Sequence, residues 1–173
     1  MKKVLIFSLL CTLGVTLFAQ NGSKKNKHHY FVYIDDTSFV TSMPEQGATL
    51  TAYFKNDTLY KIKTWFGFNF GDVTREYFYW NDTLNLIIET QKMYASTAVP
   101  KINPDSVKAH YTGRYIFKKG KLTDISQKGN YSISDTPSTK AETEATFLML
   151  SDKYRKVAYA KAKKKKNRTK VTE

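Results

Sequence analysis

Ten basic side chains gather at the end of the chain, where their spacing suggests contact with an anionic surface. They are Lys153, Arg155, Lys156, Lys161, Lys163, Lys164, Lys165, Lys166, Arg168 and Lys170, and the only acid among or after them is Glu173. Each basic residue near an anionic bilayer contributes about 1 kcal/mol to binding. The run predicts reversible, salt-sensitive adsorption to phospholipid headgroups or lipopolysaccharide phosphates. The alternative is a solvated tail that only keeps the protein soluble.

A second group of side chains could bind a ligand by stacking. Aromatic residues make up 14% of the chain. Six of them stand out in segments of alternating polarity, namely Tyr53, Trp65, Tyr77, Tyr79, Tyr111 and Tyr115. On an uncovered sheet face they would form a surface for sugar rings or another apolar partner. The alternative is packing in the core and across strands, because the chain has few aliphatic residues to build a core without them.

The acids and histidines form no catalytic or metal-binding pattern in the sequence. Asp72 and Glu76 would share a strand face as an acid/base pair, but Arg75 beside them favours a solvated pair. His28-His29 lacks a third fixed ligand, and Asp35-Asp36 lacks the series of oxygen ligands that calcium needs. There is no serine in a glycine elbow and no phosphate-binding loop. The sequence therefore predicts a protein that is not an enzyme and needs no cofactor or metal.

Three predicted β-hairpins between residues 48 and 127 position most of these side chains. Their turns lie in Phe54-Lys55-Asn56-Asp57-Thr58-Leu59, in the similar Tyr79-Trp80-Asn81-Asp82-Thr83-Leu84 and in the looser Phe117-Lys118-Lys119-Gly120-Lys121-Leu122. Each motif places a turn pair between an aromatic residue and a leucine, which is typical of a hairpin. The flanking residues alternate in polarity with a period of two, and this predicts strands.

The predicted elements follow one another in a simple order. Strands are expected at 30–34, 48–55, 59–66, 74–80, 84–89, 111–118 and 122–126, and longer connections at 67–72 and 95–107. Asp135-Thr136-Pro137 is typical of a helix start, and apolar spacing predicts a helix from about 137 to about 162. The fold class is therefore mainly β, an antiparallel meander of hairpins with one C-terminal α-helix covering the sheet. An α+β fold is the alternative.

The start of the chain is predicted to be an export signal. Lys2 and Lys3 precede an apolar run, and cleavage is expected after Ala19, with an uncleaved anchor as the alternative. Cys11, the single cysteine, follows a leucine where lipidation needs a small residue, so neither a lipid anchor nor a disulfide is expected. The predicted organisation is a signal peptide at 1–19, a flexible leader at 20–29, a single β-rich domain at 30–160 and a basic disordered tail at 161–173.

The positive charge of the chain is concentrated in residues 153–173, which hold ten of the basic residues and one acid. The chain has 28 Lys and Arg against 15 Asp and Glu, a net charge of +13. Residues 20–152 hold 16 of these basic residues and 14 of the acids, so the body is close to neutral. Because of this balance and the predicted export, nucleic acid is not an expected partner.

The hairpin motifs resemble the Tyr/Phe-x-x-Gly-x-Leu hairpins of MORN-variant repeat proteins. The resemblance covers residues 52–62, 77–88 and 115–125, and the first two segments lack the glycine of the motif. The chain also resembles small exported proteins of Bacteroidota-type bacteria. These resemblances imply a hairpin fold and a location in the cell envelope, and they imply no activity.

Three short motifs resemble acceptor sites for O-glycosylation in Bacteroidota-type bacteria. They are Asp57-Thr58-Leu59, Asp82-Thr83-Leu84 and Asp105-Ser106-Val107, which match the pattern Asp-Ser/Thr-aliphatic. The resemblance implies a glycan on Thr58, Thr83 and Ser106, of which the first two lie at predicted turns. The alternative is ordinary turn chemistry.

These features predict an exported, non-enzymatic binding or scaffold module of the bacterial envelope. It would be periplasmic, outer-membrane-associated or secreted, and its basic tail would adsorb it to an anionic membrane or lipopolysaccharide surface. The sequence does not identify its protein or glycan partner. The alternative, suggested by the MORN-like hairpins, is an immunity or antitoxin-like protein that blocks a partner enzyme through its sheet.

Overall fold

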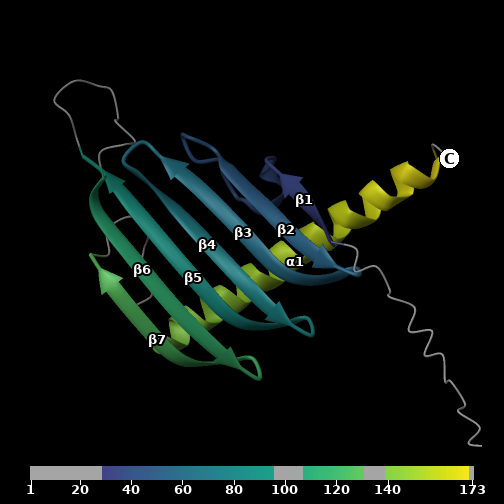
Figure 1. Cartoon of the computed structure of the whole chain (residues 1–173). Helices are drawn as coiled ribbons and strands as arrows, with labels where there is room; N and C mark the ends of the chain where they lie inside the picture. The colour runs from purple at the N-terminus through teal and green to yellow at the C-terminus, as the bar shows by residue number, and fades with distance from the viewer. Residues whose placement is uncertain (1–28, 96–106, 131–138, 172–173) are drawn as a thin grey trace, which may run out of the picture.

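Seven strands lie side by side in one antiparallel sheet in the computed structural model, which describes residues 29–95, 107–130 and 139–171. The strands are β1 (His29–Ile34), β2 (Ala48–Lys55), β3 (Thr58–Phe68), β4 (Gly71–Trp80), β5 (Thr83–Tyr94), β6 (Val107–Lys118) and β7 (Lys121–Gly129). Each strand pairs with the next one in the sequence, so the sheet is a meander (Figure 1). This confirms the predicted mainly β meander with a C-terminal helix packed on it.

Three of the turns adopt the left-handed backbone expected from their residue types. The φ angles are 48° and 67° at Asn56 and Asp57, 48° and 58° at Asn81 and Asp82, and 51° and 73° at Lys119 and Gly120. Two successive residues with positive φ make a turn whose twist matches that of the flanking strands. Asn, Asp and Gly adopt this conformation at low cost, which explains why the chain reverses at these pairs, although Lys119 adopts it without such a preference.

A β-bulge accompanies each of these three turns. The register shifts between Tyr53 and Phe54, between Phe78 and Tyr79, and between Ile116 and Phe117. Beyond the shift, the aromatic residue and the leucine that flank the turn face each other and are both buried. These pairs are Phe54 with Leu59, Tyr79 with Leu84, and Phe117 with Leu122. The bulges let each hairpin twist while its last pair stays in the core.

Residues 67–72 form strand ends and a tight turn, so the predicted longer connection there is wrong. The backbone of Gly67 explains the difference, because its carbonyl accepts from the Gln46 N–H at 3.0 Å and its N–H donates to the Gly47 carbonyl at 2.9 Å. A Cβ at Gly67 would lie 2.7 Å from the Cβ of Gln46. Glycine here permits close backbone approach within a strand.

One long helix, α1 (Lys140–Val171), crosses one face of the sheet from β7 to β1 (Figure 1). Thr139 caps it: its hydroxyl accepts from the Glu142 N–H at 3.2 Å, and the Glu142 carboxylate accepts from the Thr139 N–H at 2.9 Å. This capping box starts the helix three residues later than predicted. The helix also continues to Val171, so the predicted disorder of residues 161–171 is wrong. Lysine, alanine and arginine favour helix, and no Gly or Pro interrupts the run.

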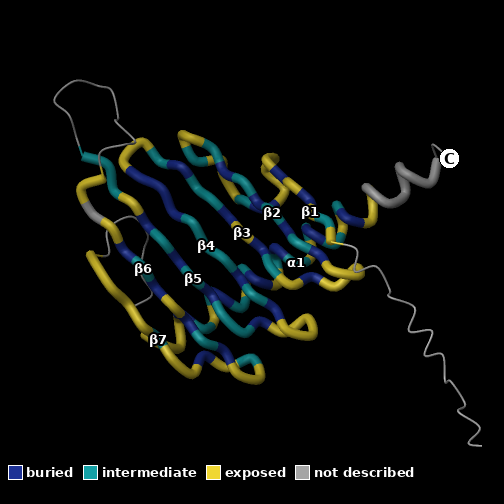
Figure 2. Tube along the Cα trace, in the orientation of Figure 1, coloured by how far each residue is buried: buried dark blue, intermediate teal, exposed yellow. Residues whose placement is uncertain are grey.

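The core lies between α1 and the sheet (Figure 2). The buried residues of α1 recur every three or four positions, as expected for one helix face. They are Thr143, Phe147, Ser151, Tyr154, Ala158 and Ala162. A short 3-10 helix, η1 (Thr37–Phe39), adds Phe39, whose ring lies 6.2 Å from the rings of both Phe66 and Tyr154.

Candidate functional site

The side chains of each strand alternate between two faces of the sheet. We call the face that packs against α1 the covered face. We call the other the open face, because no element of the described chain lies over it (Figure 1). The register of the strands shows which side chains are neighbours on each face.

An aromatic and aliphatic row crosses the open face near the hairpin turns. In register from β1 to β6 its members are Phe31, Tyr53, Lys61, Phe78, Leu86 and Ile116. The Nζ of Lys61 lies 4.9 Å from the centre of the Tyr53 ring and 5.7 Å from that of Phe78. It also donates to Glu76 Oε1 at 3.1 Å. The row therefore presents rings with a cation held between them.

Further exposed rings lie beside this row. Tyr60, the extra residue of the first bulge, has its ring 6.2 Å from that of Tyr53 and 6.1 Å from that of His29. Phe31 and Tyr33 on the edge strand β1 are 57% and 55% exposed. So many accessible rings on neighbouring strands are characteristic of a binding surface.

A second row on the open face carries hydroxyl groups around an indole ring. In register from β2 to β6 its members are Thr49, Trp65, Thr74, Thr90 and Thr112. All five are half-buried. Neighbouring strands lie about 4.8 Å apart, so the hydroxyls form a regular series of donors and acceptors.

Only two of the six aromatic residues predicted as a stacking surface lie on the open face. These are Tyr53 and Trp65, whereas Tyr77, Tyr79, Tyr111 and Tyr115 are buried on the covered face. The prediction of one surface made of all six is therefore wrong. On the covered face the tyrosine rings pack together with buried aliphatic side chains such as Leu50, Ile62 and Ile87. Tyr115 packs edge-on against Phe147 of α1 with ring centres 4.6 Å apart.

The structure divides the ten basic residues predicted to contact anionic surfaces. Lys161 donates to Asp36 at 2.5 Å, Lys156 pairs with Asp152 at 2.7 Å, and Arg155 lies over the Tyr79 ring. Lys153 faces a groove that is described below. Lys163 and Lys164 are exposed on α1, which runs past the edge strand β1 (Figure 1). The side chains of Lys165, Lys166, Arg168 and Lys170 lie outside the described part of the structure.

The Lys161 contact fastens α1 to the loop after β1. Hydrogen bonds from Lys161 and from Ser38 hold the pKa of Asp36 well below its usual range. A carboxylate that accepts two such bonds stays ionised at acidic pH. Lys161 therefore belongs to the folded body rather than to a free basic tail.

The other predicted positions have simple surroundings. Thr58 and Thr83 are both exposed at the starts of β3 and β5, as a glycan acceptor must be. Ser106, the signal peptide at 1–19 and the leader up to His28 lie outside the described residues. Asp72 and Glu76 do not pair with each other, since Asp72 accepts from the Tyr94 hydroxyl at 2.7 Å. Burial and this hydrogen bond raise the pKa of Tyr94 to about 12.

The covered face contains a groove of about 530 Å³ that is open to solvent. It lies between the start of β4, the end of β3, the segment 39–45 and α1. Its lining is more apolar than polar, and the apolar part includes Phe66, Phe68, Val73, Leu150 and Tyr154. Two cations, Arg75 and Lys153, and one acid, Glu45, also line it within the described chain.

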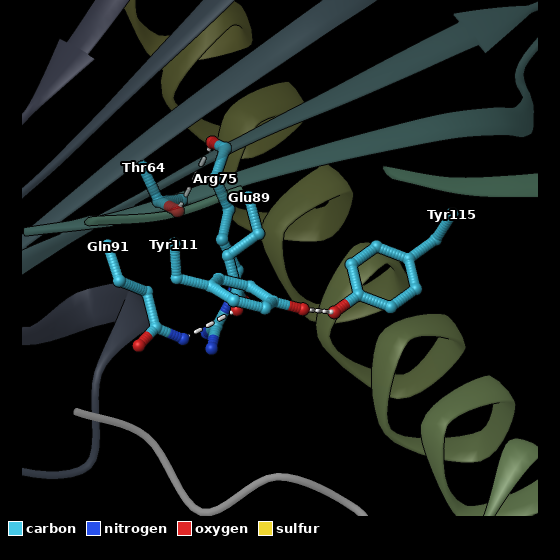
Figure 3. A network of polar contacts seen from close by, with 6 residues as sticks. All are labelled: Thr64, Arg75, Glu89, Gln91, Tyr111 and Tyr115. Atoms are coloured by element: carbon cyan, nitrogen blue, oxygen red, sulfur yellow. Dashed lines mark hydrogen bonds and ion pairs between the residues drawn. The ribbon is translucent and has the colours of Figure 1, made fainter. Parts of the chain in front are cut away.

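A buried polar network lies beside this groove (Figure 3). The Nε of Arg75 on β4 is paired with Glu89 on β5, whose side chain is fully buried. The other oxygen of Glu89 accepts from Gln91 Nε2 at 2.8 Å. Nearby, the hydroxyls of Tyr111 and Tyr115 lie 2.9 Å apart. A buried ion pair is retained at a desolvation cost, so its hydrogen-bond partners are essential to it.

The sequence analysis did not identify Arg75, Glu89 and Gln91 as candidate site residues. One signal could have found them, because Glu89 and Gln91 fall on the same strand face as the apolar Ile87. Polar residues at positions that alternation assigns to the core indicate either a buried network or a ligand site. Sequence alone did not show which neighbour on β4 would meet them.

The chain was compared with family models, curated proteins and solved structures, and none of them matches it. Within the described residues, no three His, Cys, Asp or Glu side chains are placed so that they could hold a metal ion. The helix described here does not combine the length and apolar content needed to cross a membrane.

Proposed function

We propose that this chain is an exported, non-enzymatic binding module of the bacterial envelope whose ligand is an extended polysaccharide on the open face. The observation that carries the proposal is that face itself. It places exposed and half-buried aromatic rings in one row and half-buried threonines in another, on a face that no described element covers. Sugars combine flat C–H faces, which stack on rings, with hydroxyls, which bond to polar side chains.

The charges on the open face favour a hydroxylated ligand over a purely apolar one. Between the two rows, Lys63 and Arg114 are exposed and Glu76 is half-buried. An apolar partner would desolvate these groups without replacing their hydrogen bonds with water, which is costly. Sugar hydroxyls can satisfy them, and the six strands of the aromatic row span about 24 Å.

The proposal is tested by removing the two central rings. A Tyr53→Ala, Trp65→Ala double variant should bind envelope polysaccharide at least tenfold more weakly than the wild-type chain in affinity electrophoresis. Phe70→Ala is a suitable control, because Phe70 is an exposed ring that stacks on Phe68 near the groove. Equal binding by the double variant and the wild type would contradict the proposal.

The immunity or antitoxin-like function remains the alternative for the same face. It predicts a single protein, captured in a fixed ratio from an envelope extract, whose binding also depends on Tyr53 and Trp65. Capture of such a protein, with no binding of polysaccharide, would replace the first proposal by this one.

We further propose that the basic end of α1 adsorbs the module to anionic phospholipid or lipopolysaccharide. Lys163 and Lys164 are exposed on α1, and α1 runs past the edge strand β1 (Figure 1). A chain that ends at Ala162 keeps the buried residues of α1 and removes six of the ten basic residues. It should sediment less with anionic vesicles than the full chain at low salt. At about 1 M salt, where the screening length is about 3 Å, the difference should vanish.

A further inference from the structure

We infer that the groove on the covered face is a second binding site, for an acyl chain that ends in a carboxylate. The groove does not depend on the proposed polysaccharide surface, because it lies on the opposite face of the sheet. Its volume of about 530 Å³ falls within the range of small-molecule sites, about 300 to 1,000 Å³. It is open to solvent, so a flexible chain can enter without displacing α1.

The walls of the groove suit a hydrocarbon chain. Phe66, Phe68 and Val73 line it from the sheet, and Leu150 and Tyr154 line it from α1. Met43, in the segment that forms the third wall, is an exposed side chain of the kind that adapts to different apolar shapes. Burying methylene groups against such walls is the main source of affinity for an acyl chain.

Arg75 supplies the anchor for the carboxylate. Its Nε is committed to Glu89, and the described residues offer no further hydrogen bond or ion pair to its guanidinium. The two Nη groups of an arginine are a planar pair of donors that binds a carboxylate through both oxygens. Arg75 lines the groove with 16% of its side chain exposed, so a ligand can reach it.

The network behind Arg75 holds this anchor in place. Glu89 is fully buried and is itself held by Gln91, so the guanidinium has one preferred orientation. Lys153 is a second cation in the lining, against the single acid Glu45. Glu89 already balances the charge of Arg75, so the Nη donors of Arg75, rather than a surplus of positive charge, select an anionic end group. A preorganised arginine beside an apolar groove favours an acyl carboxylate over an uncharged lipid.

The test compares dodecanoate with dodecanol as probes of the full chain by calorimetry. Dodecanoate should bind at one site per chain and more tightly than dodecanol. An Arg75→Met, Glu89→Gln double variant should weaken dodecanoate at least tenfold and leave dodecanol unchanged. The double change is needed because removing Arg75 alone would leave the charge of Glu89 buried and unpaired.

If the double variant does not fold, two further variants show whether the probes bind in the groove. Ser42→Trp, in the exposed part of the groove lining, should block the binding of both probes without touching the core. Lys153→Met should weaken dodecanoate about threefold, whereas Lys156→Met, a nearby lysine outside the groove lining, should not. Equal affinity of the wild type for both probes would overturn the anchor. Binding that survives Ser42→Trp would overturn the site.

Discussion

Each face of the sheet holds an ion pair between a basic residue and a glutamate on the neighbouring strand. The two pairs differ in how far their side chains are exposed to solvent. On the covered face, Arg75 and Glu89 have 16% and 0% of their side chains exposed. On the open face, Lys61 and Glu76 have 23% and 27% exposed. β4 supplies one member of each pair, Arg75 on the covered face and Glu76 on the open face, so two successive residues of one strand belong to the two pairs.

This difference indicates which charged side chains can bind a ligand and which are needed to stabilise the fold. Both members of the open pair are partly exposed, and Lys61 lies between two rings, so a ligand can replace water around the pair at little cost. In the buried pair, Glu89 is out of water and Arg75 is largely buried, so the pair depends on Gln91 and on its own geometry. Removing one member of a buried pair leaves an uncompensated charge, whereas an exposed pair contributes little to stability.

The largest expected effect comes from breaking the buried pair. Glu89→Leu should lower the free energy of unfolding by about 3 to 5 kcal/mol, because Arg75 is then charged, largely buried and unpaired. Glu76→Leu is the matched control and should cost at most about 1 kcal/mol. Urea denaturation of both variants measures the difference. Equal losses would show that the two faces do not differ in this way.

A smaller effect, with opposite signs, is expected for two tyrosine hydroxyls on the covered face. The Tyr77 hydroxyl is buried and has no hydrogen-bond partner among the described residues. Tyr77→Phe should therefore stabilise the fold by about 1 kcal/mol. The Tyr79 hydroxyl lies 3.0 Å from Ser151 Oγ, so Tyr79→Phe should destabilise it by about 1 kcal/mol. Thermal unfolding measures both, and a destabilising Tyr77→Phe would contradict the prediction.

The smallest effect on stability at neutral pH is expected for Tyr30, whose hydroxyl donates to Asp57 Oδ1 at 3.0 Å. Burial and this hydrogen bond raise the pKa of Tyr30 to about 12 from an ordinary value of 10.0. The folded chain thus keeps the proton longer than the unfolded chain. The stability from this group is present below pH 10 and is lost as the pH rises towards 12. Tyr30→Phe should flatten the fall in the urea midpoint above pH 10, and an unchanged fall would exclude this contribution.

Local signals in the sequence were sufficient for much of the fold. The turn pairs at Asn56-Asp57 and Asn81-Asp82 predicted where strands reverse, because their preference for positive φ is a property of those residues alone. The alternation of polar and apolar residues predicted the strands, because it too can be recognised within a short stretch of the sequence. The helix was placed within three residues at its start, but its end was not, since the lysine-rich run was interpreted by its charge rather than by its helix propensity.

Most of the candidate site needed information that alternation does not contain. A period of two separates two faces but does not say which one meets α1, so Tyr77 and Tyr111 were grouped with Trp65 on one surface. The Arg75 and Glu89 pair depends on the register between β4 and β5, and a bulge at Phe78 and Tyr79 shifts that register. The groove depends on the segment 39–45 folding back beside α1, which no local pattern predicts.

The position of α1 at the end of the described chain has a consequence for the order of folding. Every strand pairs with its neighbour in the sequence, whereas α1 joins Leu59 to Tyr159 and Asp36 to Lys161 across 100 and 125 residues. As the chain emerges, the hairpins can form one after another, but the covered face of the sheet stays in contact with water until the 32 residues of α1 follow. A half-made sheet with an apolar side in water is prone to aggregate and is a target for chaperones. The apolar covered face is therefore buried, and the described domain protected from aggregation, only once α1 has packed on the sheet.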